Sequence, residues 1–207
     1  MGNTVLRMLD EAAEKWGGDP YALKKTDSGY EAVSFREARD RARDFAAWLV
    51  GAGFRRGDSL AVLGEGSPEW ILGEFGLVAA GCVSVPLSIK LLGEEIPFRL
   101  NHSEAKAVLT TRNQLEKVLG SFKDVENKAI KVVYLDDDPD AAREAAAKFG
   151  IAPDRITGFD EACAAGRAAR SAPGSRADAG LDALAAAARA DDTVTICYTS
   201  GTTGNPK

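Results

Sequence analysis

The sequence predicts an α/β fold in which a mostly parallel sheet is flanked by helices on both faces. Short apolar runs, typical of buried strands, alternate along the chain with longer stretches of helical periodicity. The apolar runs are rich in β-branched residues and do not alternate with polar ones, which is typical of strands buried on both faces. Strand–helix alternation with strands of this kind favours a parallel sheet covered by helices.

The first quarter of the chain predicts a helix, a hairpin and a second helix. Residues 21–25 and 30–33 flank the turn 27–29, Asp-Ser-Gly, which is a hairpin pattern. Ser34 and Glu37 have the spacing of a capping box, and the helix that they open ends near Gly51. The opening helix is indicated by one apolar stripe, formed by Val5, Leu6, Leu9, Ala12 and Ala13.

The middle of the chain carries the strands of the expected sheet. The turn at Gly57-Asp58 precedes the first of them, and Pro68 can open the helix that follows, where its missing N–H costs nothing. The predicted strands are residues 59–63, 82–85, 107–110 and 130–135, and the predicted helices are residues 68–80, 96–101, 113–119 and 141–149.

Three consecutive acids, Asp136, Asp137 and Asp138, allow two interpretations. They could bind a metal ion, but they lack the spacing, the glycine and the distal glutamate of an EF-hand loop. Acidic residues before Pro139 also fit the start of a helix, where they face the positive end of the helix dipole. We favour the helix start.

Residues 163–190 are biased toward Ala, Arg, Gly and Ser, and they contain the loop signal Ala-Pro-Gly-Ser at 172–175. We interpret this stretch as a variable connector over the surface, in which residues 181–189 could form a helix. It is not expected to be a second domain, so residues 1–207 are treated as part of one domain.

Composition excludes several classes of protein. A net charge of −5 and a pI near 5.1 argue against a general nucleic-acid surface. The sequence has no apolar run long enough for a membrane span and no secretory signal, although a peripheral membrane contact stays open.

Three cysteines without metal spacing indicate reduced thiols and a cytoplasmic protein, with Cys82 and Cys197 expected to be buried in apolar runs. His102, the only histidine, is expected to pack or to end a helix.

The last ten residues, 198–207, are the most informative stretch. Glycines at 201 and 204 let the backbone approach an anion closely, and successive N–H groups can form an anion-binding concavity. Hydroxyl groups add donors, and Lys207 adds a point charge for a phosphate. The predicted phosphate-binding residues are Thr199, Ser200, Gly201, Thr202, Thr203, Gly204 and Lys207.

This loop is not a Walker loop. In that motif the lysine follows the second glycine directly, whereas Asn205 and Pro206 separate Gly204 from Lys207 here. A P-loop of the kinase type is therefore disfavoured. The simpler alternative is a mobile Gly/Thr surface loop with no ligand.

The string Tyr-Thr-Ser-Gly-Thr-Thr-Gly-Asn-Pro-Lys at 198–207 resembles the signature of the AMP-forming acyl-CoA synthetases, a superfamily that also contains luciferases, aryl-CoA ligases and peptide-synthetase adenylation domains. Weaker likenesses precede it in the expected order: Val33-Ser34-Phe35, Gly57-Asp58, and His102 with the four residues after it. The phrases at 64–70 and 85–90 look most like the long-chain fatty acid branch. Residues 138–190 carry no such likeness.

The resemblance implies an incomplete N-terminal portion of an AMP-binding (adenylation) domain. The implied activity is that of a carboxylate–CoA ligase, which forms an acyl-adenylate from ATP and then a thioester with coenzyme A. Thr199 to Gly204 would hold the β- and γ-phosphates with the help of Lys207, and Thr199 is a possible ligand of Mg²⁺. The implied substrate is a small carboxylate, most like a long-chain fatty acid.

The family's adenine, ribose and catalytic lysine positions would lie downstream of Lys207, so residues 1–207 alone are expected to be inactive. Two alternatives stay open. One is another adenylate-forming enzyme, such as an aryl-CoA ligase or an amino-acid adenylation domain. The other is a non-catalytic module that binds a nucleotide or a partner.

Overall fold

The computed structural model describes residues 5–199, and the side chains of residues 7–199. The chain divides into two compact units, each assembled from separate stretches of sequence. Unit 1 consists of Met1–Gly57, Gly66–Cys82 and Phe159–Asp192, and unit 2 of Asp58–Glu65, Val83–Gly158 and Thr193–Lys207. Each unit therefore depends on chain segments that are distant in sequence.

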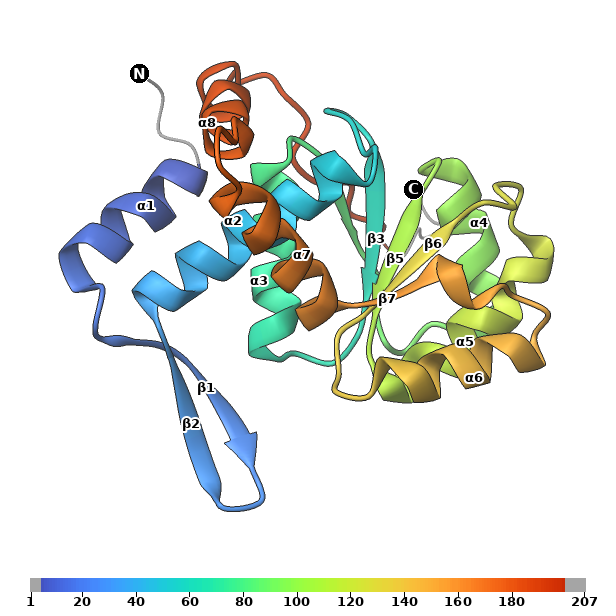
Figure 1. Cartoon of the computed structure of the whole chain (residues 1–207). Coiled ribbons are helices and arrows are strands. Elements are labelled where there is room, and N and C mark those ends of the chain that lie inside the picture. The colour runs from blue at the N-terminus through green and yellow to red at the C-terminus, as the bar shows by residue number, and fades with distance from the viewer. Residues whose placement is uncertain (1–4, 200–207) are drawn as a thin grey trace. The chain divides into compact units, whose positions relative to one another are not determined.

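Unit 1 is built of helices and one hairpin (Figure 1). The hairpin pairs β1 with β2 in antiparallel register, with Thr26 opposite Gly29, and so confirms the predicted turn. The elements are α1 (Val5–Trp16), β1 (Pro20–Thr26), β2 (Gly29–Ser34), α2 (Phe35–Gly51), α3 (Pro68–Ala79), α7 (Phe159–Ser171) and α8 (Ala177–Ala186).

Helix α2 is central to the packing of unit 1. Its buried face includes Ala38, Ala42, Phe45, Ala46 and Leu49 at helical spacing. Its N-cap is Ser34, whose hydroxyl accepts a hydrogen bond from the backbone N–H of Glu37 at 3.2 Å. Helix α7 approaches α2 so closely that a Cβ at Gly166 would overlap the carbonyl oxygen of Asp44. Only glycine fits this crossing without a shift of backbone.

Unit 2 contains a five-stranded parallel sheet with the order β4-β3-β5-β6-β7. Because parallel crossovers are right-handed, the three steps from β4 to β5, β6 and β7 place α4, α5 and α6 on one face of the sheet (Figure 1). The elements are β3 (Ser59–Leu63), β4 (Val83–Pro86), η1 (Gly93–Glu95), α4 (Ile96–His102), β5 (Ala107–Thr110), α5 (Arg112–Ser121), η2 (Phe122–Asp124), β6 (Lys131–Tyr134), α6 (Pro139–Lys148), η3 (Pro153–Arg155) and β7 (Ile156–Gly158).

The parallel sheet flanked by helices confirms the predicted fold class. The strands at 59–63 and 107–110 have the predicted bounds, and those at 82–85 and 130–135 are displaced by a residue or shortened. Strand β7 was not predicted, because its three residues, Ile156–Gly158, are too few to give a periodic signal. This strand forms because its backbone pairs with strand β6.

Residues 163–190 contain most of α7 and the whole of α8, joined at the predicted loop signal. Cys163 and Gly166 are buried in α7, so this half of the stretch packs closely instead of running loosely over the surface. Gly166, one of the small residues that suggested a connector, permits the close approach of α7 to α2. Helix α8 begins at Ala177, earlier than the sequence suggested, and Leu181 is its buried residue.

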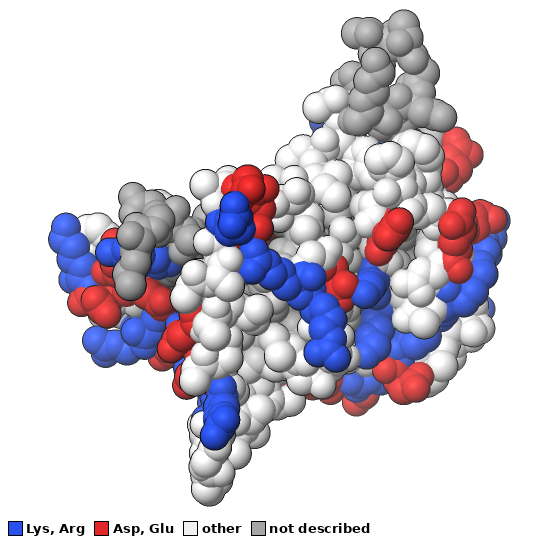
Figure 2. Space-filling model, turned by 90° about the horizontal axis from the view of Figure 1, so that it is seen from above, with Lys and Arg blue, Asp and Glu red and all other residues white. Residues whose placement is uncertain are grey.

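Figure 2 shows Lys and Arg groups beside Asp and Glu groups on the face that it draws. No helix in the described range 5–199 is both long and apolar enough to cross a membrane.

Candidate phosphate-binding site

Of the seven predicted phosphate-binding residues, the structure describes one. Thr199 is exposed at the end of the described chain. Ser200, Gly201, Thr202, Thr203, Gly204 and Lys207 lie outside the described residues. The geometry of the site is therefore known through the segment that leads into it, which belongs to unit 2.

Residues 194–196 lead into the loop alongside strand β4. Ser84 of β4 pairs with Thr195 in parallel. The N–H of Ser84 donates to the carbonyl of Val194 at 2.9 Å, and the N–H of Ile196 donates to the carbonyl of Ser84 at 2.8 Å. These two bonds extend the parallel sheet beyond β4, its edge strand, and fix the direction in which the chain enters the loop.

Tyr198 provides a second attachment, to helix α4. Its hydroxyl donates to the carbonyl of Arg99 at 3.1 Å and lies 2.9 Å from Nδ1 of His102. Its ring packs against the hydrophobic core of unit 2, as does Ile196. Burial raises the pKa of the Tyr198 hydroxyl, against smaller opposing effects of Ser103 and Arg99, so the phenol stays protonated at neutral pH. Thr199 thus follows directly after an anchored residue.

The side chains before the loop alternate in burial, and this corrects one prediction. Ile196 and Tyr198 are half-buried, whereas Cys197 between them is exposed and not buried as its apolar run suggested. Successive side chains of an extended segment point to opposite sides, so only alternate residues reach the core. Cys82 is buried, as predicted. His102 ends α4 and so has the predicted helix-end position.

Of the three consecutive acids, Asp138 serves the start of the helix that was favoured. Asp138 has a φ of +67° and is the N-cap of α6, where its side chain accepts from the N–H of Ala141 at 3.1 Å. Asp136 accepts from the N–H of Arg112 at 2.5 Å. Among the described residues, no three His, Cys, Asp or Glu side chains gather in a way that could hold a metal ion.

A polar cluster that the sequence analysis did not identify lies at the carboxyl ends of β3 and β5. The strand order reverses direction between these two strands, which in open α/β sheets is where ligands commonly bind. The carboxylate of Glu65 accepts from the hydroxyl of Thr111 and, at 2.6 Å, from Nε2 of Gln114. Burial opposes ionisation, but these hydrogen bonds hold the pKa of Glu65 below its usual value. The sequence signal would have been polar residues directly after two apolar strands.

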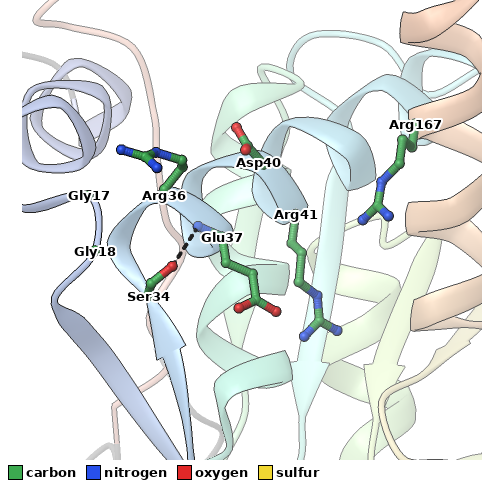
Figure 3. A pocket seen from close by; sticks show the side chains of 8 residues that line it. All are labelled: Gly17, Gly18, Ser34, Arg36, Glu37, Asp40, Arg41 and Arg167. Carbon is green, nitrogen blue, oxygen red and sulfur yellow. Dashed lines mark hydrogen bonds between the residues drawn. The ribbon is translucent and has the colours of Figure 1, made fainter.

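Unit 1 has a cleft of about 420 Å³, drawn in Figure 3, and it is lined by charged side chains of α2 and α7. Arg41 pairs with Asp160 at 2.5 Å, and Arg167 pairs with Asp44 at 3.0 Å. The Glu37 side chain extends away from Ser34, so the predicted capping box is made on one side only. Two of the three arginines that line the cleft, Arg41 and Arg167, therefore already pair with carboxylates.

Comparisons with solved structures agree with the fold. The adenylation domain of a carboxylate reductase from Mycobacterium chelonae superposes with a TM-score of 0.76 at 24% identity, covering 100% of this chain and 34% of that one. A benzoate CoA ligase from Burkholderia xenovorans superposes with a TM-score of 0.67 at 19% identity, covering 93% of this chain and 32% of that one. The chain is therefore an α/β protein folded like part of an adenylation domain.

The sequence match makes the assignment specific. The chain matches the family "AMP-binding enzyme" over residues 9–207, a range that includes the whole predicted phosphate loop, and it belongs to that family.

Two curated relatives illustrate the match. Long-chain-fatty-acid–CoA ligase ACSBG1 of Rattus norvegicus is 28% identical over 206 residues, which are 99% of this chain and 26% of that protein. 4-Hydroxybutyrate–CoA ligase 2 of Metallosphaera sedula is 32% identical over 200 residues, which are 95% of this chain and 32% of that protein. The chain thus spans between a quarter and a third of the length of these relatives.

Proposed function

We propose that the protein carrying this chain is an AMP-forming carboxylate–CoA ligase, and that its substrate is a long-chain fatty acid. The observation that carries the proposal is the family match, which runs without interruption into the loop at 198–207. Several relatives are named long-chain-fatty-acid–CoA ligases, from mammals and from mycobacteria. The assignment as a carboxylate–CoA ligase does not depend on which carboxylate is the substrate.

The proposed reaction has two steps. A carboxylate oxygen of the substrate attacks the α-phosphorus of ATP, so that an O–P bond forms, the bond to the β-phosphate oxygen breaks, and pyrophosphate leaves. The thiol of coenzyme A then attacks the acyl carbonyl, loses its proton and displaces AMP. In the first step the protein must hold the triphosphate and stabilise the charge that moves onto pyrophosphate.

Thr199 to Gly204 and Lys207 are proposed to bind the β- and γ-phosphates. Successive backbone N–H groups supply directed donors, and the lysine supplies a charge that follows the leaving pyrophosphate. The attachment of Ile196 and Tyr198 supports this role, since donors that are held in place need no reorganisation during the reaction.

Magnesium is part of the proposal. Mg²⁺ keeps several waters and binds to few protein oxygens together with substrate phosphates, so a single hydroxyl fits it better than a carboxylate cage would. The exposed hydroxyl of Thr199 is such a ligand, and the described residues contain no acidic cage. When bound, the ion would neutralise phosphate charge.

The experiment that tests the function is ATP–pyrophosphate exchange by the complete protein that carries this chain. Candidate carboxylates are palmitate, 4-hydroxybutyrate, benzoate and a mixture of amino acids, each with Mg·ATP. Exchange that depends on palmitate is the expected result. Exchange with another of these acids keeps the reaction and replaces the substrate, while no exchange with any of them in a folded protein contradicts the proposed ligase.

Two further parts of the proposal are tested alongside. Residues 1–207 alone are proposed to be inactive, which measurable exchange by this piece would contradict. A non-catalytic module is the second candidate, and binding of Mg·ATP by the complete protein without any exchange would favour it. The cytoplasmic location suggested by the three free cysteines also remains part of this proposal.

A further inference from the structure

Tyr198 contacts three groups near the C-terminal end of helix α4: the Arg99 carbonyl, the Arg99 guanidinium and the His102 ring. Its hydroxyl lies within hydrogen-bond distance of the Arg99 carbonyl and of His102 Nδ1. Its ring meets the His102 ring edge-on, with centroids 5.7 Å apart, and the Arg99 guanidinium lies 5.9 Å from its centroid. His102 is itself stacked on Phe98 at 5.6 Å, so the partner of Tyr198 is also supported.

The donor in each hydrogen bond of Tyr198 depends on which group carries the proton. A phenol has one proton, and the Tyr198 hydroxyl uses it toward the Arg99 carbonyl, which accepts only. When the phenol proton is directed at the Arg99 carbonyl, the contact with His102 is made by a protonated Nδ1 that donates. Both the Nδ1–H tautomer and the imidazolium satisfy this, so the bond does not depend on the charge of His102.

The same contact adds a donor to a carbonyl near the C-terminal end of α4. The last carbonyls of a helix have no partner inside the helix and need one elsewhere. The Arg99 carbonyl accepts from the N–H of Ser103 at 3.0 Å and from the hydroxyl of Ser103 at 2.7 Å, as well as from Tyr198. Helix α4 thus presents a fixed acceptor and a fixed donor to the residue that precedes Thr199.

We infer that Tyr198 and His102 are a positioning pair that fixes the entry to the ATP phosphate loop. Tyr198 touches no reacting atom: it acts through Thr199 and the loop backbone. The inference rests on the proposed function, because it assigns these residues to the same site. It goes beyond the signature motif, since His102 lies 96 positions earlier in the sequence and in another element.

The test uses the complete protein and substitutions that remove the hydrogen bonds of Tyr198 together or one at a time. Tyr198→Phe keeps the ring and loses both hydrogen bonds. His102→Ala removes the donor, and His102→Asn restores a donor near the position of Nδ1. The matched control is Tyr134→Phe, which removes a hydroxyl in the same unit that is bonded to Arg112 Nε at 3.2 Å and is remote in sequence from the loop.

The expected result is a rise in the Kd of Mg·ATP and in the KM for ATP of about 3- to 10-fold for Tyr198→Phe and His102→Ala, which is the size of one lost hydrogen bond of about 0.7–1.4 kcal/mol. His102→Asn recovers most of the affinity, and Tyr134→Phe leaves it unchanged. The KM for the carboxylate stays within twofold in all variants, which a general loss of structure would not allow. Amide hydrogen exchange of residues 196–199 rises in the first two variants only.

Unchanged ATP affinity in both Tyr198→Phe and His102→Ala, in a protein that binds Mg·ATP, would overturn the inference and leave the proposed function intact. An equal loss in Tyr134→Phe would also overturn it, because the effect would then be general. If the unsubstituted protein binds no Mg·ATP and gives no exchange, the proposed function fails and the positioning role fails with it.

Discussion

Cys163 and Cys197 show how differently one residue type behaves in this chain. The Cys163 thiol is buried in α7, and burial raises its pKa to about 12, while Arg41 lowers it to a smaller extent. Cys197 is exposed on the segment that leads to the phosphate loop. The thiolate is the reactive form, so Cys163 is inert in the folded protein and Cys197 is the accessible thiol.

The raised pKa of Cys163 gives a pH-dependent stability. An unfolded thiol titrates near pH 8.5, whereas the folded one stays protonated up to about pH 12. The stabilisation is therefore complete below pH 8.5 and is lost as the pH rises toward 12. Between pH 7.5 and pH 10 the free energy of unfolding should fall by about 1.5–2 kcal/mol more in the natural protein than in Cys163→Ala. Urea unfolding at both pH values measures this difference, and parallel losses in the two proteins would contradict it.

Helices α2 and α7 meet at a crossing that small residues make possible. Buried in α2, Asp44 accepts from Arg167 at 3.0 Å and from Arg170 at 2.5 Å, both in α7. Gly166, also in α7, lets the backbones of α7 and α2 approach closely. The composition of residues 163–190 suggested a connector because alanine and glycine carry no pattern of their own. Their role becomes visible only when the facing helix is in place.

Two glycine-to-alanine substitutions in these helices are expected to have opposite signs. Gly166→Ala adds a Cβ that overlaps the Asp44 carbonyl and should destabilise by about 1–3 kcal/mol, despite the better helix propensity of alanine. Gly180→Ala in α8 has nothing within 4 Å of the new Cβ and should stabilise by about 0.5–1 kcal/mol. Urea unfolding of the two variants measures both effects. Stabilisation by both would show that propensity alone decides, and destabilisation by both would contradict the prediction for Gly180.

At the scale of the whole molecule, the phosphate loop should couple nucleotide binding to stability. A ligand at ten times its Kd stabilises the folded protein by about 1.4 kcal/mol. We expect Mg·ATP at this concentration to raise the midpoint of thermal unfolding of the complete protein by about 1–2 °C, because the shift per kcal/mol falls as a chain becomes longer.

The substitution Lys207→Ala should remove most of this shift with ATP. AMP lacks the β- and γ-phosphates that the lysine is proposed to bind, so the shift produced by AMP should survive the substitution. Differential scanning fluorimetry with both nucleotides makes the comparison. Equal losses for ATP and AMP would place Lys207 elsewhere than at the distal phosphates.

Much of the fold could be predicted because its signals are local. The strands Ser59–Leu63 and Ala107–Thr110 are continuous apolar runs, and Ser34, Pro68 and Asp138 mark helix starts by side-chain chemistry that acts within one turn. Strand β7 could not be predicted, since three residues carry no periodicity and the strand exists by pairing with β6. The exposure of Cys197 was wrongly predicted, because an apolar run does not say which of its faces meets the core.

At the candidate site, too, some features follow from the sequence and others only from the tertiary structure. The sequence by itself determined the family and the parallel α/β class. It also predicts a phosphate loop at residues 199–207, because glycine spacing, hydroxyls and a lysine are properties of consecutive residues. Only the tertiary structure decided what holds the entry to that loop. Ser84 and His102 meet Thr195 and Tyr198 across about a hundred residues of chain, through the sheet edge and the end of α4. No local pattern encodes such contacts, since they arise when the sheet brings distant segments together.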